Sequence, residues 1–236
     1  MFWELIKNGG CTASKVPFER WDVDAEIARD KTMSEHVARC VQWGSFVKDL
    51  ELFDAAFFGI SSAEASAIDP QQHVLLKCTY LALKDAGYTK ESVQGRNIGV
   101  FVGITAFDNS VMSSNAQGFD VYSLNRSDQA TSAGRISFLF GLQGLCSAYA
   151  TACSSSLVAL HSAVRCLQCG DCECAIVLGV NTIVAGTPFA MMGSPPQAAA
   201  TRSMQQLMDI CEERDVALWC SSAWTMFWLT TIVCMR

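Results

Sequence analysis

The chain has 236 residues, which suits one large domain or two small ones. Half of the residues are apolar and 17% are charged, a composition that excludes an intrinsically disordered chain. The formal net charge is −6 at pH 7 and no run of Lys or Arg occurs, so the sequence argues against binding to nucleic acid or to anionic membrane surfaces.

The first part of the chain predicts a cover and one long helix. Residues 44–60 are dense in Phe and predict an irregular, loop-rich cover. Asp69-Pro70 is a helix-start signal, because proline fits the first helical position. Apolar residues follow at helical spacing as far as Ala86, and Gly87 is a stop signal, so we expect a helix over this stretch.

Short apolar runs predict the strands of a sheet. Residues 97–103 and 175–180 are continuous apolar runs, which predict strands covered on both faces. Residues 145–150 predict a shorter strand, and residues 104–130 predict loops with a short helix. Residues 154–168 make the clearest helix, which is apolar nearly all round and therefore typical of a protein interior. Strands that alternate with helices predict an α/β domain.

The composition changes near Ser194, where a turn-rich stretch of small residues begins. We therefore expect one domain over residues 1–193 and an unrelated tail over residues 194–236. Residues 216–235 carry no charge and have the length of a membrane-spanning helix. A membrane anchor, a buried helix, and a tail without an evolved role that arose from a splicing or gene-model error are the alternatives.

Cys153 lies in the run ATACSSSLVAL, where a turn of small residues leads from the expected strand 145–150 into the helix 154–168. The first amides of a helix point outward and carry partial positive charge, and both features stabilise a thiolate. A cysteine in this position is a good nucleophile, and its own backbone N–H can help to hold an oxyanion. The competing interpretation is a buried, inert cysteine beside a serine-rich helix start.

The run from Thr151 to Ala159 resembles the active-site signature of β-ketoacyl synthases, in particular of the ketosynthase domains of modular polyketide synthases and fatty-acid synthases. Further segments resemble the family in the same order, over roughly residues 1–190. They are PFERWD at 17–22, FDAAFFGIS at 53–61, DPQQ at 69–72, DAGY at 85–88, GVFVG at 99–103, GRIS at 134–137 and GVN at 179–181.

The resemblance implies a thiolase-like layered α/β fold, of which this chain holds an incomplete N-terminal half without the first strand. It implies that Cys153 accepts an acyl group, and that a malonyl-type extender then loses CO₂ and attacks the thioester, in polyketide or fatty-acid biosynthesis. No bound cofactor is expected, because phosphopantetheine arrives on an acyl carrier protein. The resemblance also implies a homodimer.

Two histidines normally complete such a site, in motifs that none of the histidines of this chain matches. We expect His36 in a polar loop, His73 on a helix surface, and His161 in the core or at an interface. Ala150 stands where the family commonly has aspartate. The chain alone is therefore expected to be inactive or nearly so in condensation, because acid–base help and oxyanion stabilisation are each worth orders of magnitude.

Two further hypotheses belong to other function classes. One is a truncated ketosynthase-like module that binds acyl groups or dimerises without condensing. The other is a tail-anchored membrane protein, with membrane contact only through residues 216–235. A chain without its second half should also expose apolar surface beside the helix 154–168 and be marginally stable.

The twelve cysteines are too few for a disulfide scaffold. Glu4 and Lys7 interrupt the N-terminal apolar stretch, so no secretory signal is expected. The sequence therefore predicts mostly free thiols and a cytoplasmic location, with a plastid or a membrane left open.

Two groups of residues invite a metal-site interpretation. The spacing C-x2-C-x2-C-x-C suggests metal binding, but its last gap is too short for a ferredoxin pattern, and free thiols are the competing interpretation. These cysteines are Cys166, Cys169, Cys172 and Cys174. The carboxylates Asp108, Asp120 and Asp128 lack metal-ligand spacing and are expected to be solvated loop residues.

Overall fold

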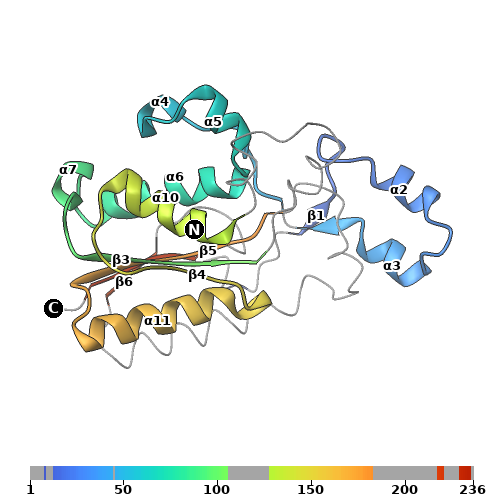
Figure 1. The fold of residues 1–236 in the computed structure, drawn as a ribbon. Coiled ribbons are helices and arrows are strands. Elements are labelled where there is room, and N and C mark those ends of the chain that lie inside the picture. Colours follow the sequence, from blue (N-terminus) through green and yellow to red (C-terminus); the bar gives the residue numbers. More distant parts are fainter. Residues whose placement is uncertain are drawn as a thin grey trace.

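The structure is a computed structural model that describes Asn8, residues 13–44, 46–105 and 128–182, and two later strands at 217–220 and 229–234. Helices cover both faces of a five-stranded sheet (Figure 1). α6 (Pro70–Asp85) and α10 (Gln129–Phe140) lie on one face, and α11 (Ser155–Cys169) lies on the other. This arrangement confirms the layered α/β fold that the sequence predicts.

The sheet has the strand order β4-β3-β5-β7-β6. β3 (Ile98–Ile104) lies between β4 (Cys146–Tyr149) and β5 (Cys174–Val180) and is parallel to both. β7 (Leu229–Cys234) is antiparallel to β5, and β6 (Ala217–Cys220) is antiparallel to β7. Every residue of β3 and β5 is buried, as continuous apolar runs predict for strands covered on both faces.

Local sequence signals set the starts of the two long helices on the first face. The Oδ1 atom of Asp69 accepts the amide N–H of Gln71 at 2.8 Å and so caps α6. Asp128 caps α10 in the same way, through the amide N–H of Ala130 at 2.9 Å. Asp128 is therefore exposed, as expected of a loop carboxylate, and it also caps the start of a helix.

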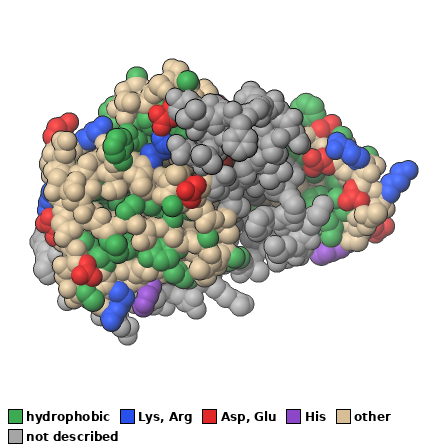
Figure 2. Space-filling view, viewed as in Figure 1, with side chains coloured by type: hydrophobic (Ala, Val, Ile, Leu, Met, Phe, Trp, Pro, Cys, Tyr) green, Lys and Arg blue, Asp and Glu red, His purple; other side chains and the backbone are tan. Residues whose placement is uncertain are grey.

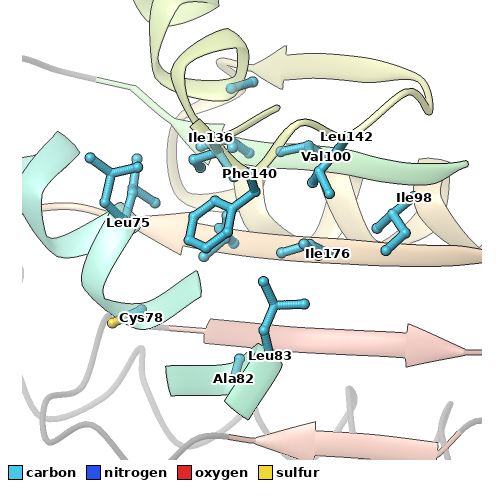
Figure 3. Close-up of a cluster of buried hydrophobic side chains, with 14 of the residues drawn as sticks. Leu75, Cys78, Ala82, Leu83, Ile98, Val100, Ile136, Phe140, Leu142 and Ile176 are labelled. Atoms are coloured by element: carbon cyan, nitrogen blue, oxygen red, sulfur yellow. The ribbon is translucent and has the colours of Figure 1, made fainter. Parts of the chain in front are cut away.

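Apolar side chains fill both spaces between helices and sheet. The larger cluster packs α6 and α10 onto the sheet, and Figure 3 shows the ring of Phe140 between Leu75 of α6 and Ile176 of β5. The smaller cluster packs α11 onto the opposite face of the sheet. It contains Ala163 of α11 and Val177 of β5. Because side chains alternate along a strand, β5 supplies Ile176 to one cluster and Val177 to the other.

Short elements surround this core. The expected loop-rich cover contains the short helix α4 (Ala55–Phe58). Two more short helices follow along the chain, α5 (Ser62–Ala67) and α7 (Lys90–Val93). To one side, Figure 1 shows the ribbon of β1 (Ser14–Lys15) and β2 (Trp43–Gly44) with α2 (Val23–Arg29) and α3 (Glu35–Cys40). His36 therefore lies on a helix, where the sequence analysis expects a polar loop, because Ser34 caps that helix.

Residues 216–235 do not form the continuous helix that their length suggests. Their described parts are the strands β6 and β7, which join the sheet through β5. The β7 sequence, LTTIVC, is rich in β-branched residues, which favour a pleated sheet over a helix. Among the described residues, no helix is long and apolar enough to cross a membrane.

Candidate active site

Cys153 lies between the end of β4 and the start of α11. β4 ends at Tyr149, the single 3₁₀ turn η1 (Ala152–Ser154) follows, and α11 begins at Ser155. This is the strand–turn–helix arrangement that the sequence predicts. The Cys153 thiol is free and the residue is exposed, which excludes the alternative of a buried, inert cysteine.

The backbone directly before Cys153 has an unusual conformation. Ala152 has a φ of +54°, in the left-handed region that residues with a side chain rarely adopt. Such a conformation costs about 1–3 kcal/mol and persists only where surrounding contacts hold it. It turns the chain sharply from the strand into the helix and leaves Cys153 on the outside of the turn.

Ser155 supplies the contacts that hold this turn. Its buried Oγ accepts the amide N–H of Thr151 at 2.8 Å and donates to the carbonyl oxygen of Ala152 at 2.7 Å. The Oγ1 atom of Thr105, just after β3, lies 2.9 Å from the same Oγ. Oγ1 of Thr105 also donates to the carbonyl oxygen of Ala152 at 3.3 Å, and between Thr105 and Ser155 either hydroxyl can be the donor. The strained residue is thus fixed from its own helix and from the neighbouring strand.

A second layer of contacts supports this network. Nε2 of Gln129, the first residue of α10, donates to the carbonyl oxygen of Thr105 at 3.0 Å. The Oγ of Ser154 donates to the carbonyl oxygen of Thr151 at 2.8 Å. Three elements of the fold, β3, α10 and α11, therefore meet at the turn that carries Cys153.

The start of α11 provides a positive electrostatic environment for Cys153. No described side chain caps this helix start, so its first amide N–H groups have no side-chain acceptor. The helix dipole adds partial positive charge at the same end. An anion that forms here is therefore stabilised by the backbone.

The described structure brings no histidine into contact with this turn. His161 is exposed on α11, so it does not lie in the core, because this side of the helix does not face the sheet, and the alternative position at an interface stays a prediction. His73 on α6 is half-buried, where the sequence analysis expects a helix surface. Its ring stacks on Phe53 with centroids 4.1 Å apart, and its Nε2 lies 3.1 Å from the carbonyl oxygen of Ala65. Burial, together with the positive charge of Arg135, lowers the pKa of His73.

The four clustered cysteines do not converge on one point. Cys166 and Cys172 belong to the apolar cluster under α11, whereas Cys174 belongs to the cluster on the opposite face of the sheet. Cys169 is exposed. In the described part of the chain no group of three or more metal-ligating side chains occurs, and Asp108 and Asp120 lie outside it. Because the sheet separates Cys174 from Cys166 and Cys172, the arrangement favours the free-thiol interpretation.

Sequence reasoning does not find the residues that hold the turn. Thr105 and Gln129 are far from Cys153 in the chain, and only the fold brings them to it. Ser155 lies within the signature, but the sequence does not distinguish it from the serines on either side of it. The structure separates it from its neighbours by its burial and its hydrogen bonds.

Comparison with known proteins assigns the chain to a family. Residues 1–208 match the family model of the β-ketoacyl synthase N-terminal domain. The chain belongs to the β-ketoacyl synthase family. The turn around Cys153 is therefore the segment that carries the signature of this family, and the match ends within the expected tail.

Several curated polyketide synthases are similar to this ketosynthase chain. It is 40% identical over 189 residues to the non-reducing polyketide synthase olcA of Penicillium canescens, covering 79% of this chain and 8% of that protein. It is 38% identical over 189 residues to a protein of the phenolphthiocerol/phthiocerol polyketide synthase of Mycobacterium bovis, covering 80% of this chain and 10% of that protein. The chain thus spans about a tenth or less of these relatives' length.

Solved ketosynthases share the fold. The oxazolomycin ketosynthase domain OzmH KS7 of Streptomyces albus matches with a TM-score of 0.69 and 30% identity, over 81% of this chain and 34% of that one. The ketosynthase from module 6 of the bacillaene synthase of Bacillus subtilis matches with a TM-score of 0.66 and 30% identity, over 80% of this chain and 30% of that one. The chain therefore corresponds to about a third of a solved ketosynthase chain.

Other ketosynthase segments meet away from Cys153 and have a structural role. Arg135 of GRIS donates from Nε to Oε1 of Gln72 at 2.8 Å and forms an ion pair with Glu64. Gln71 accepts the amide N–H of Thr182, just after β5, at 3.2 Å. These contacts fasten α6 to α10 and to the end of β5, so the DPQQ and GRIS segments hold the helix layer together.

Proposed function

We propose that this chain provides the acyl-accepting part of a ketosynthase that acts in polyketide biosynthesis. The observation that carries the proposal is the exposed Cys153, set on a strained turn at the open start of α11. Family membership supports the reaction type, and the names of the similar proteins, which are polyketide synthases, favour polyketides over fatty acids.

The first proposed step is acyl transfer to Cys153. The thiolate attacks the carbonyl carbon of an acyl thioester, and the carbonyl oxygen becomes an oxyanion near the free backbone amides of the helix start. When the tetrahedral intermediate collapses, the carbon–sulfur bond to the donor breaks and the donor thiol leaves. Cys153 then holds the acyl group as a thioester.

The second proposed step is decarboxylative condensation. A malonyl-type thioester loses CO₂, the resulting carbanion attacks the acyl group on Cys153, and a carbon–carbon bond forms as the cysteine thiolate leaves. This step needs acid–base help and a second oxyanion site. None of the described histidines contacts the Cys153 turn, so we propose that the chain alone accepts acyl groups without condensing them.

The proposed substrates arrive as thioesters of phosphopantetheine on an acyl carrier protein, and no resident cofactor is invoked. The free thiols of the described residues support a reducing location, the cytoplasm. We also propose a homodimer. β4 is an edge strand of the described sheet, and exposed apolar residues lie beside it, Phe138 on α10 and Leu145 before β4. Figure 2 shows hydrophobic side chains scattered over this face.

The test is acylation of the full chain by an acyl-pantetheine thioester, followed by intact mass and peptide mapping. We expect one acyl adduct on Cys153, which Cys153→Ala abolishes and Cys169→Ser, a change at another exposed cysteine, leaves intact. Added malonyl-pantetheine should yield no condensation product. Labelling of several cysteines at equal rates, or an adduct that persists in Cys153→Ala, would contradict the proposal.

A further inference from the structure

A second cysteine feature lies at the other end of the helix that begins beside Cys153. Cys166, in the last turn of α11, donates to Cys172, with the two Sγ atoms 3.2 Å apart. Both residues are buried, with exposed fractions of 5% and 4%. The turn that joins them, residues 169–171, is exposed. The two sulfurs therefore lie in contact directly beneath a surface turn.

The fold holds the two sulfurs together from both sides. Gly170 ends α11 in the left-handed conformation, with φ +76°, and the amide N–H of Asp171 donates to the carbonyl oxygen of Cys166 at 3.0 Å. The chain thereby folds back so that Cys172 lies over the helix end. On the strand side, the Cys172 thiol lies against β3, because a Cβ on Gly99 would come within 3.4 Å of its sulfur.

The protonation state favours close approach of the sulfurs. Burial raises the pKa of the Cys172 thiol. Cys172 is therefore a neutral thiol near pH 7, and no repulsion between two thiolates opposes the contact. The pair needs only to shorten from 3.2 Å to the disulfide bond length of about 2.05 Å.

We propose that Cys166 and Cys172 form a redox site that a peroxide converts to an intramolecular disulfide. One thiol loses its proton and its sulfur attacks the O–O bond of hydrogen peroxide to become a sulfenic acid. The departing hydroxide takes up that proton and leaves as the first water. The second sulfur displaces the hydroxyl group, which leaves as the second water. Two S–H bonds and one O–O bond break, one S–S bond and two O–H bonds form, and the two electrons that the thiols lose reduce the peroxide.

The disulfide would join the end of α11 to the residues that lead into β5. It lies at the opposite end of α11 from the Cys153 turn, so the proposal does not depend on the role of Cys153. Because the bridge crosses a short turn that already has the required shape, it should raise the melting temperature without changing the fold.

The test is peptide mapping of the full chain after treatment with hydrogen peroxide and alkylation of the remaining thiols. Cleavage after Arg165 and before Asp171 separates Cys166 from Cys172, so a bridge between them appears as two linked peptides that a reductant releases. We expect this link in the wild-type chain and in Cys169→Ser, and its loss in Cys166→Ser.

Fragmentation of the two linked peptides locates the bridge in the wild-type chain, because one peptide also holds Cys169 and the other also holds Cys174. This mapping decides the proposal even if a variant fails to fold. A bridge that uses Cys169, Cys174 or Cys153 would overturn it. So would full alkylation of Cys166 and Cys172 under conditions in which the exposed Cys153 is already oxidised.

Discussion

Gly103 of β3 and Ser155 of α11 lie closer together than a side chain would allow. A Cβ on Gly103 would be 2.6 Å from the carbonyl carbon of Ser155 and 2.6 Å from the amide nitrogen of Ser156. The end of the strand and the start of the helix therefore touch backbone to backbone. This contact sets the distance between the sheet and the turn that carries Cys153.

Replacement of Gly103 by Ala should separate the strand from the helix. We expect Gly103→Ala to lower the free energy of unfolding by about 1–3 kcal/mol, because the added methyl group overpacks a backbone contact. Acylation of Cys153 should slow as well. Chemical denaturation and an acylation time course measure the two effects.

Gly134 provides the matched control. It lies inside α10, and apart from its chain neighbours and the helix backbone no described residue has an atom within 4 Å of the position that its Cβ would take. Gly134→Ala should leave acylation unchanged and stabilise the chain by about 0.5–1 kcal/mol, because alanine favours a helix. Equal losses in the two variants would show that the Gly103 contact has no special role.

Removal of the Ser155 hydroxyl should release the strained turn. Ser155→Ala deletes the acceptor for Thr151 and the donor to Ala152, so the φ of +54° at Ala152 loses its main support. We expect a cost of about 1–3 kcal/mol and a rate of Cys153 alkylation by iodoacetamide lower by about tenfold. Iodoacetamide labelling of Cys153, followed by mass spectrometry, measures the rate.

Ser154 gives the comparison for this prediction. Its hydroxyl is exposed and bonds only to Thr151 among the described residues, so Ser154→Ala should leave the labelling rate within about twofold of wild type. Ser155→Thr, which keeps a hydroxyl, should recover part of the rate. An unchanged rate in Ser155→Ala would mean that the turn keeps its shape without the network.

The sequence predicts the central strands and the cysteine turn well, because these depend on local patterns. β3 and β5 are continuous apolar runs, and the helix α11 has an apolar stripe that starts just after a cluster of small residues. The position of Cys153 at the junction follows directly. The signals lie within short windows, where periodicity is informative.

The sequence fails where distant contacts decide the structure. α10 is not predicted because Gly134 interrupts the pattern, yet burial of Ile136 and Phe140 against the sheet overrides that weak helix propensity. Residues 229–234 belong to the uncharged stretch whose length suggests a helix, and only their pairing with β5 makes them a strand. The bond between Thr105 and Ser155 joins positions 50 residues apart, and no short window contains both.

The half-buried His73 should make stability depend on pH. Burial lowers the pKa of His73 in the folded chain, so at acidic pH the unfolded chain binds a proton at His73 more readily than the folded chain does. The free energy of unfolding should be unaffected above the ordinary histidine pKa of about 6.5 and should fall as the pH drops below it. Thermal melts at about pH 7.5 and about pH 5.5 measure the difference.

His73→Gln removes the titrating ring and keeps a donor for the carbonyl oxygen of Ala65. We expect its melting temperature to fall less between the two pH values than that of wild type. His161→Gln, a change at an exposed histidine on α11, should retain the wild-type fall. The same pH dependence in all three chains would exclude His73 as the cause.

The exposed Phe138 should contribute to self-association. Its side chain is 83% exposed on α10, the helix that packs against the edge strand β4, and an apolar group of this size loses solvent contact when two copies meet. We expect Phe138→Ser to weaken a dimer in sedimentation velocity without lowering the melting temperature. Phe18 is the matched control, because it is 79% exposed but lies in the segment between β1 and α2, and Figure 1 shows α2 apart from β4. If Phe18→Ser weakens association as strongly as Phe138→Ser, the chain associates through general apolar exposure, and the edge of the sheet is not the dimer interface.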